Sequence, residues 1–236
     1  MSDKKIYSIL GDSISTYGGY TPLAYDFYDR YTSAEAGIRS VEDTWWMQVI
    51  HAAGGTLGYN NSISGSTVSG DVSLSGTSET RLRSLAKNGC PDVIFLYMGG
   101  NDWAYSVLPN EFEDAYRRML NKLLMLYPDS EIYCATLLRG KDVEDPSMRF
   151  FNVDACVSPR IYSRIIRDCA LKAGVNLIDL EKYGQDFNDP QLKERYFEKG
   201  HMNAAGYQMM AWTFMTYINW IIENNLSDFS DISLVK

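Results

Sequence analysis

The sequence predicts an α/β fold built on a parallel sheet with helices on both faces. Short apolar runs rich in β-branched and aromatic residues alternate with amphipathic segments along the chain, as in βαβ units. The run 92–98 (DVIFLYM) is apolar almost throughout, which indicates a strand buried on both faces. No linker, internal repeat or low-complexity tract interrupts the 236 residues, so we expect a single domain over residues 1–236.

The expected strands are short and rich in residues that favour extended backbone. Right-handed crossovers through helices would connect them in parallel. A polar loop is expected at 138–159, after the fourth strand. The expected strands are residues 6–10, 57–60, 92–98, 131–137 and 175–180.

The expected helices carry apolar residues at helical spacing between start and stop signals. The first follows an N-cap at Asp43 or Thr44 and ends at Gly54. Asn110 followed by Glu113 resembles a capping box, which predicts a helix start there. The expected helices are residues 45–53, 82–86, 110–127, 161–170 and 203–224.

Composition excludes several classes of function. A net charge of −8 disfavours nucleic-acid binding, which needs clustered Lys and Arg. No apolar run is long enough for a membrane span. The four cysteines lack CxxC spacing, so we expect neither a disulfide framework nor a structural metal site. The first residues lead directly into a strand without a secretory segment, so the chain is expected to be cytoplasmic, or secreted if a leader has been removed.

Three polar or glycine positions follow three successive strands. Ser13 follows the first, Gly65 the second and Asn101 the third. The carboxyl ends of parallel strands meet at one edge of the sheet, where ligands bind in α/β folds. The strand assignments alone therefore bring these residues together.

Ser13 is the candidate nucleophile and His201 its candidate base. A serine hydroxyl needs a base that takes its proton, and the chain has two histidines. His51 lies inside the first expected helix, whereas His201 lies in a loop before the last one, so a Ser–His hydrolase must use His201. The alternatives are that Gly-Asp-Ser merely ends a strand and that His201 is a loop residue without a role. The chain has no Gly-x-Ser-x-Gly, so an α/β-hydrolase elbow is absent.

Four sequence blocks resemble those of the SGNH (GDSL) hydrolases, which are serine esterases and acylhydrolases. They are Gly11-Asp12-Ser13-Ile14-Ser15, Ser62-Ile63-Ser64-Gly65-Ser66, Gly99-Gly100-Asn101-Asp102 and Glu198-Lys199-Gly200-His201. The resemblance spans residues 6 to about 207. It implies a three-layer α/β/α sandwich whose five strands have the flavodoxin-like order 2-1-3-4-5. It also implies catalysis without a cofactor or metal.

The resemblance further implies an oxyanion hole. Its donors would be the Ser13 N–H, the Gly65 N–H and the Asn101 side-chain amide, aimed at charge that develops in the transition state. Taken alone, Gly65 also fits a turn glycine and Asn101 a strand-end cap. Asp12 and Asp102 are interpreted as loop and cap anchors.

The third member of the triad departs from the family pattern. The family usually places Asp three residues before the histidine, and Glu198 stands there in this chain. A carboxylate at that place would orient the imidazole and stabilise its charged form. The alternatives are a backbone carbonyl or another acid such as Glu194, with Glu198 as a surface charge.

Aromatic residues crowd the segment after Ser13 and the segment after Asn101. They would stack on a sugar, form the wall of an acyl pocket, or only pack the loops. Trp45 and Trp46 are assigned to the helix and the core. We expect hydrolysis of a short acyl ester, such as acetyl, of a carbohydrate or small alcohol, at a site under loops 14–42 and 138–159. The alternatives are a lysophospholipase or thioesterase with longer acyl preference and a non-catalytic ligand-binding domain. The oligomeric state is not predicted. The aromatic residues are Tyr17, Tyr20, Tyr25, Phe27, Tyr28, Tyr31, Trp103 and Tyr105.

Overall fold

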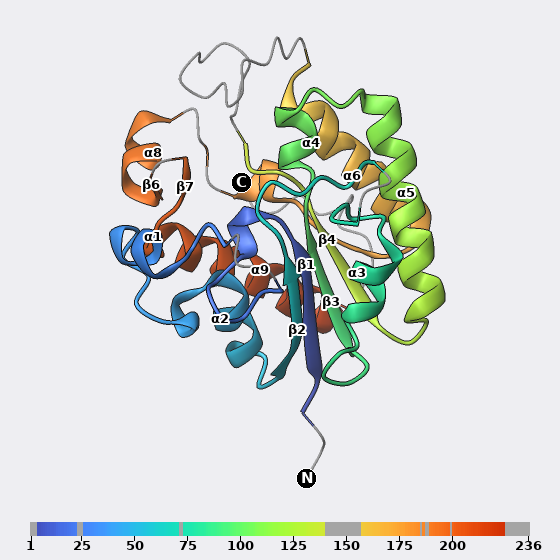
Figure 1. Cartoon of the computed structure of the whole chain (residues 1–236), viewed down its shortest axis with the longest axis horizontal. Helices are drawn as coiled ribbons and strands as arrows, with labels where there is room; N and C mark the ends of the chain where they lie inside the picture. Colours follow the sequence, from blue (N-terminus) through green and yellow to red (C-terminus); the bar gives the residue numbers. More distant parts are fainter. Residues whose placement is uncertain are drawn as a thin grey trace.

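The computed structural model describes residues 4–22, 26–70, 73–139, 157–184, 186, 189–198 and 200–224. They form a five-stranded parallel sheet of order β2-β1-β3-β4-β5 (Figure 1). This is the order that the family resemblance implies. The strands are β1 (Ile6–Gly11), β2 (Thr56–Ser62), β3 (Val93–Tyr97), β4 (Glu131–Ala135) and β5 (Asn176–Ile178).

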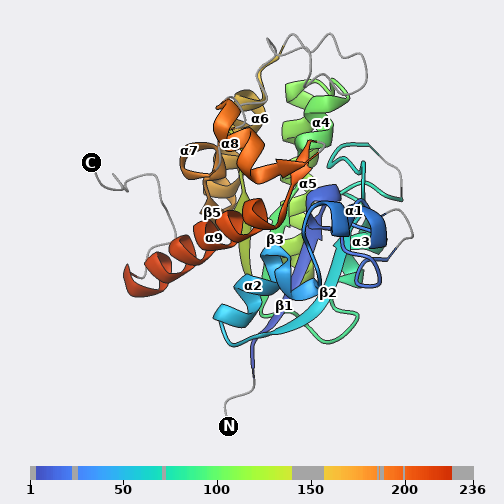
Figure 2. The same cartoon turned by 90° about the vertical axis from the view of Figure 1, so that its left-hand side faces the viewer.

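Helices cover both faces of the sheet. Figures 1 and 2 show α2 and α9 on one face and α3, α5 and α6 on the other. No helix among the described residues is both long and apolar enough to cross a membrane. The helices are α1 (Arg30–Glu35), α2 (Trp45–Ala52), α3 (Glu79–Ser84), α4 (Gly100–Ala104), α5 (Pro109–Leu126), α6 (Pro159–Ala173), α7 (Leu180–Tyr183), α8 (Pro190–Tyr196) and α9 (Ala204–Asn224).

The two central strands are buried on both faces, as predicted for a parallel sheet. Every residue of β3 is buried, and so is every residue of β1 after Ile6. The strand order reverses at β1, between β2 and β3. At such a reversal the connections leave toward opposite faces, and a crevice opens at the carboxyl ends of the strands.

Local interactions explain most helix ends, and one sequence prediction is wrong. Thr44 caps α2 by accepting from the Met47 N–H. The capping box predicted at Asn110 is absent, because α5 already begins at Pro109, whose missing N–H suits the first turn. The predicted strands at 131–137 and 175–180 end earlier, at Ala135 and Ile178. Most of the predicted loop 138–159 lies outside the described residues.

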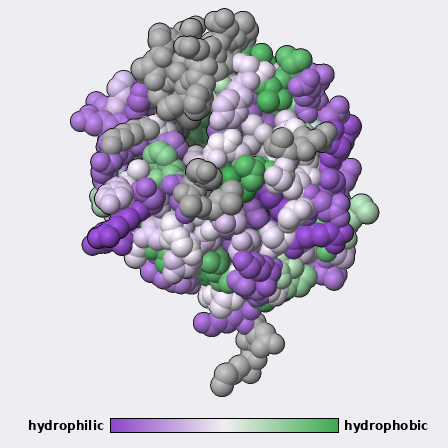
Figure 3. Space-filling model, viewed as in Figure 1, coloured by the Kyte–Doolittle hydropathy of each residue, from purple (hydrophilic) through white to green (hydrophobic). Residues whose placement is uncertain are grey.

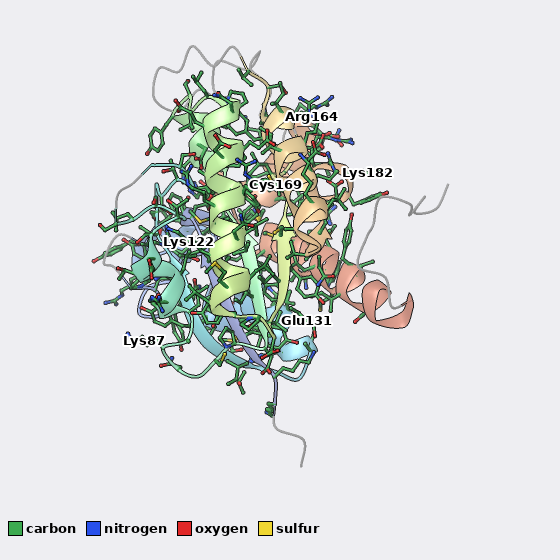
Figure 4. The ribbon with its side chains drawn as sticks, turned by 90° about the vertical axis from the view of Figure 1, so that its right-hand side faces the viewer. Lys87, Lys122, Glu131, Arg164, Cys169 and Lys182 are labelled. Atoms are coloured by element: carbon green, nitrogen blue, oxygen red, sulfur yellow. The ribbon has the colours of Figure 1, made fainter. Side chains whose placement is uncertain are left out.

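The opposite edge of the sheet carries an exposed ion pair rather than a site. Lys5 Nζ lies 2.6 Å from Glu131 Oε1, and Glu131 is labelled at the start of β4 in Figure 4. Cys169 of α6, labelled in the same view, and Cys134 are buried free thiols, and Cys90 is exposed. Cys156 lies outside the described residues.

A buried arginine joins the carboxyl ends of β1 and β2. The Arg81 side chain is 3% exposed and donates to the Gly11 carbonyl at 3.0 Å, to the Asn61 side chain at 2.8 Å and to the Leu74 carbonyl at 2.5 Å. It also donates to the Asn61 carbonyl at 2.7 Å. Burial lowers the pKa of Arg81 to about 10, and the charge of Asp12 opposes this shift.

Arg81→Met should therefore destabilise the fold. The variant removes the four hydrogen bonds that the guanidinium donates, three of them buried, which should reduce the free energy of unfolding by about 3 kcal/mol. Urea unfolding followed by circular dichroism measures this loss. The control is Arg83→Met on the same helix, which removes only an exposed pair with Glu79 and should cost about 0.5 kcal/mol. Equal losses in the two variants would contradict the role of Arg81.

Candidate active site

Ser13 lies in a tight turn directly after β1. Residues Ser13–Ser15 form one 3-10 turn, and Asp12 caps it by accepting from the Ile14 N–H at 3.0 Å. Gly11 is required for this close packing, because a Cβ there would lie 2.6 Å from Ser62 Oγ and 2.7 Å from Ser15 Cβ. The turn leaves the Ser13 side chain half-buried at the carboxyl edge of the sheet.

Three buried side chains hold the end of this turn. Trp45 Nε1 donates to Ser15 Oγ at 3.3 Å and Trp46 Nε1 donates to the Ser15 carbonyl at 3.1 Å. Asn60 Nδ2 donates to the same carbonyl at 2.8 Å. Both indoles are fully buried, so Trp45 and Trp46 belong to the core, as predicted. The position of Ser13 therefore depends on the packing of α2 and β2.

His201 reaches Ser13 from the far end of the chain. It begins β7 (His201–Met202), which pairs with β6 (Phe197–Glu198) in an antiparallel hairpin. The Tyr28 hydroxyl donates to the Met202 carbonyl at 2.7 Å and fixes this hairpin against the segment before α1. His201 Nε2 lies 2.9 Å from Ser13 Oγ across a separation of 188 residues. This is the distance that proton transfer between a nucleophile and its base requires.

The two other predicted oxyanion residues flank Ser13. Gly65 has φ +73°, a left-handed conformation that favours glycine. Asn101 Nδ2 donates to the Ser66 carbonyl at 2.9 Å, and a carboxamide nitrogen carries a second proton that a substrate could accept. Ser13, Gly65, Asn101 and His201 all line one cavity. The structure therefore brings these predicted residues together.

Asp102 anchors the loop that carries Gly65. Its carboxylate is fully buried and accepts from the Val68 N–H at 2.8 Å and from the Ser69 N–H at 2.9 Å. Burial raises the pKa of Asp102, and the hydrogen bonds oppose this shift. Asp12 and Asp102 thus lie where the sequence analysis placed them, as anchors of a cap and a loop.

The cavity has a volume of about 340 Å³ and a largely apolar wall. In the space-filling view, apolar atoms gather near the centre of the face that Figure 1 presents (Figure 3). Leu137 and Leu138 lie just beyond the end of β4 at Ala135. The sequence analysis assigned Leu137 to the strand and Leu138 to the polar loop that follows it. The apolar or aromatic lining residues are Ile14, Phe27, Tyr97, Trp103, Ala104, Tyr105, Leu137, Leu138 and Pro159.

The aromatic segment after Ser13 contributes one ring to this wall. Phe27 lines the cavity, whereas Tyr17 and Tyr20 pack on each other, with centroids 6.0 Å apart. Tyr28 is fully buried and Tyr31 is 76% exposed. Tyr25 lies outside the described residues. Loop packing therefore explains most of the aromatic residues described in this segment.

Glu198 lies beside His201 in the hairpin, but its side chain is turned to solvent. The two residues are backbone partners, and the Glu198 side chain is exposed. Within the described part of the chain, no hydrogen bond or ion pair joins its carboxylate to another residue. Glu194, the alternative acid, is also exposed, on α8. The role of Glu198 as a triad member stays a prediction.

His51, the other histidine, lies on the surface of α2 as predicted, with Nδ1 2.9 Å from Glu42 Oε2. Within the described ranges, no group of three or more His, Cys, Asp or Glu side chains is arranged to hold a metal ion.

Comparison with known families identifies the family of this chain. Residues 5–193 match the GDSL-like lipase/acylhydrolase family. The chain belongs to this family. It is therefore a carboxylic ester hydrolase, as the resemblance implied. The match covers Ser13, Gly65 and Asn101 and ends before His201. No curated protein sequence matches the chain.

Solved structures share the fold at low sequence identity. A GDSL-like lipase assigned in Bacteroides ovatus is 22% identical, with a TM-score of 0.69 over 93% of this chain and 100% of that one. The psychrotrophic esterase EstA of Pseudoalteromonas is 14% identical, with a TM-score of 0.61 over 94% and 100%. A carbohydrate esterase family 2 enzyme of Corynascus is 16% identical, with a TM-score of 0.60 over 94% of this chain and 68% of that one.

Glu198→Gln tests whether the exposed carboxylate takes part in the reaction. In the geometry described, the substitution removes no hydrogen bond or ion pair to a described residue, so we expect kcat/KM for a nitrophenyl ester to stay within about threefold of wild type. Glu198→Asp is the matched control, because it restores the usual family residue. A loss beyond about tenfold for Gln, with activity kept in Asp, would show that the carboxylate turns to His201 during catalysis.

Proposed function

We propose that this esterase acts through an acyl-enzyme on Ser13, with His201 as general base. The observation that carries the proposal is the 2.9 Å contact between Ser13 Oγ and His201 Nε2, at a cavity that Gly65 and Asn101 also line. A nucleophile, a base and donors for a developing oxyanion are together the requirements of acyl transfer.

The reaction proceeds in two proton-balanced halves. Ser13 Oγ attacks the ester carbonyl carbon while His201 Nε2 takes the hydroxyl proton. The Ser13 N–H, the Gly65 N–H and the Asn101 amide stabilise the oxyanion of the tetrahedral intermediate. The carbon–oxygen bond to the alcohol breaks, and His201 returns the proton to the alcohol. Water then attacks the acyl-enzyme, gives its proton to His201, and Ser13 recovers that proton as the acid leaves.

The proposed substrate carries a short acyl group, such as acetyl, on a small alcohol or carbohydrate. The cavity of about 340 Å³ is near the lower end of ligand pockets, which span about 300–1,000 Å³. Its apolar wall at Leu137, Leu138 and Pro159 suits a hydrocarbon rather than a sugar with several hydroxyls. In this proposal the acyl group packs against the apolar wall, and the alcohol lies toward the exposed side of the cavity at Gly65 and Tyr105.

A longer acyl chain is the second candidate. Trp103 and the two leucines present a continuous apolar surface, and a lysophospholipase or thioesterase would extend a chain along it.

Ser13→Ala should lower kcat by about 10³-fold or more without changing the fold. A fluorophosphonate probe should label the wild type at Ser13 alone, as shown by peptide mass spectrometry. In the wild type, kcat/KM should rise with pH as the histidine base loses its proton. Labelling of another residue, full activity in Ser13→Ala, or no pH dependence between about pH 5 and 8 would overturn the proposal.

A series of nitrophenyl esters separates the two substrate candidates. With acetyl to butyryl esters we expect the highest kcat/KM, and with octanoyl and longer esters a fall of about tenfold or more, because the chain must leave the cavity. The series is run beside Ser13→Ala to subtract uncatalysed hydrolysis. A maximum at octanoyl or beyond would favour the second candidate.

A further inference from the structure

Phe27 stacks face to face on the ring of His201. The ring centroids are 3.4 Å apart and the planes differ by 10°. Tyr28 meets Phe27 edge-on, with centroids 4.9 Å apart and planes at 80°. It also meets His201 edge-on, with centroids 6.2 Å apart. The imidazole thus has one face against Phe27 and an edge contact with Tyr28.

The backbone of Phe27 is tied to the segments that carry Ser13 and Gly65. Its N–H lies 3.1 Å from Thr16 Oγ1 and 2.9 Å from Ser64 Oγ. Its carbonyl accepts from Thr32 Oγ1. These contacts use main-chain atoms, so a substitution of the side chain leaves them in place. The segment after Ser13 and the segment that carries Gly65 therefore both fix the Phe27 backbone, and with it the position of the ring over His201.

The charge of the imidazole decides what this stack contributes. Two neutral aromatic rings prefer offset or edge-on contact to a direct sandwich, because their quadrupoles repel. A cation over the face of an aromatic ring is attracted to it. A face-to-face contact at 3.4 Å therefore stabilises the protonated form of His201 more than the neutral form. That protonated form arises when Ser13 or water gives up its proton.

We propose that Phe27 is a positioning residue for the general base, which holds the His201 ring against Ser13 and stabilises its imidazolium through the aromatic face. The inference rests on the proposed function, because it assumes that His201 is the base. It supplies a partner for the imidazolium that does not depend on Glu198. Phe27 also lines the cavity, so a titration of His201 without substrate isolates the effect that Phe27 exerts through the imidazole.

The other groups around His201 stay unchanged when Phe27 is replaced. Tyr28 and Tyr207 are buried, and burial raises the pKa of each tyrosine, so both stay neutral. Asp12 lines the same cavity, and Glu198 faces His201 across the hairpin with an exposed side chain. On α8, packed against the hairpin, Lys193, Glu194 and Arg195 carry charges. Because these groups are present in both proteins, their electrostatic effects on His201 cancel when wild type is compared with a Phe27 variant.

The test is a histidine NMR titration of wild type and Phe27→Leu. Because the chain has two histidines, labelling the imidazole carbons gives two signals, and His51→Gln assigns them. If the ring face stabilises the imidazolium, Phe27→Leu should lower the titration midpoint of His201 by about 0.5 pH unit. Phe27→Met is the second variant, in case leucine disturbs folding. Tyr31→Leu, an exposed aromatic of the same segment, is the matched control and should move neither signal.

The opposite shift would overturn the inference. If Phe27 only covers His201 from water, its removal reduces desolvation, which raises the midpoint of a histidine. An unchanged midpoint would equally overturn it. Phe27→Tyr and Phe27→Trp keep an aromatic face, so they should restore the wild-type midpoint, whereas a purely steric role would not distinguish them from leucine in this readout.

Kinetics separate this inference from the proposed function. Phe27→Leu should lower kcat for a short nitrophenyl ester by about threefold to fivefold, with recovery in Phe27→Tyr. His201→Ala should abolish turnover. If His201→Ala keeps its activity, the proposed function fails. If His201→Ala is inactive while Phe27→Leu matches wild type in both kcat and midpoint, only the role of Phe27 fails.

Discussion

The hydrogen bond between Ser13 and His201 is the interaction on which the site depends. It joins the end of the first strand to a hairpin near the other end of the described chain, 188 residues away. Neither two-residue strand of that hairpin could hold this position alone. The Tyr28 hydroxyl binds the Met202 carbonyl at 2.7 Å, and the Tyr207 hydroxyl binds the Ile14 carbonyl at 2.8 Å. The Ala204 N–H donates to the Ala36 carbonyl at 2.9 Å. His201 is therefore placed by a group of contacts that requires α9 to be packed against the segments around Ile14 and Ala36.

The strands of the sheet, and the meeting of Ser13, Gly65 and Asn101 at one edge of it, could be predicted from the sequence. Strands buried on both faces leave an unbroken apolar run, as in β3, and the residues after β1, β2 and β3 must then meet at one edge. Short elements escaped prediction because they have no period to detect: α4 spans five residues and β6 two. Phe27 carried no signal of its own, since one aromatic ring in a loop has no pattern that distinguishes stacking from packing. The three-residue separation of Glu198 and His201 predicted that the two residues lie close together. Such a separation does not determine where a long side chain points.

Two buried charged side chains, Arg81 and Asp102, hold the loops of the site in place through hydrogen bonds to the main chain. Arg81 donates to the Gly11 carbonyl, just before the turn that carries Ser13. Asp102 accepts from the Val68 and Ser69 N–H groups, just after Gly65. Each binds polar backbone atoms at or just beyond the carboxyl ends of the strands, Arg81 at Gly11 and Asn61 and Asp102 at Val68 and Ser69. Burial alone disfavours the charged form of either group, so the cost of keeping them is offset only while all their partners are in place. Such an arrangement favours one loop conformation over its neighbours.

The contacts of Trp45 and Trp46 with Ser15 have an experimental consequence. Both indole N–H groups donate to the turn that carries Ser13, and an indole proton resonance is sensitive to the length of its hydrogen bond. Covalent modification of Ser13 two residues away would move Ser15 and with it both resonances. The two indole resonances would therefore report the proposed acyl-enzyme on Ser13 without an attached label or a chromogenic substrate.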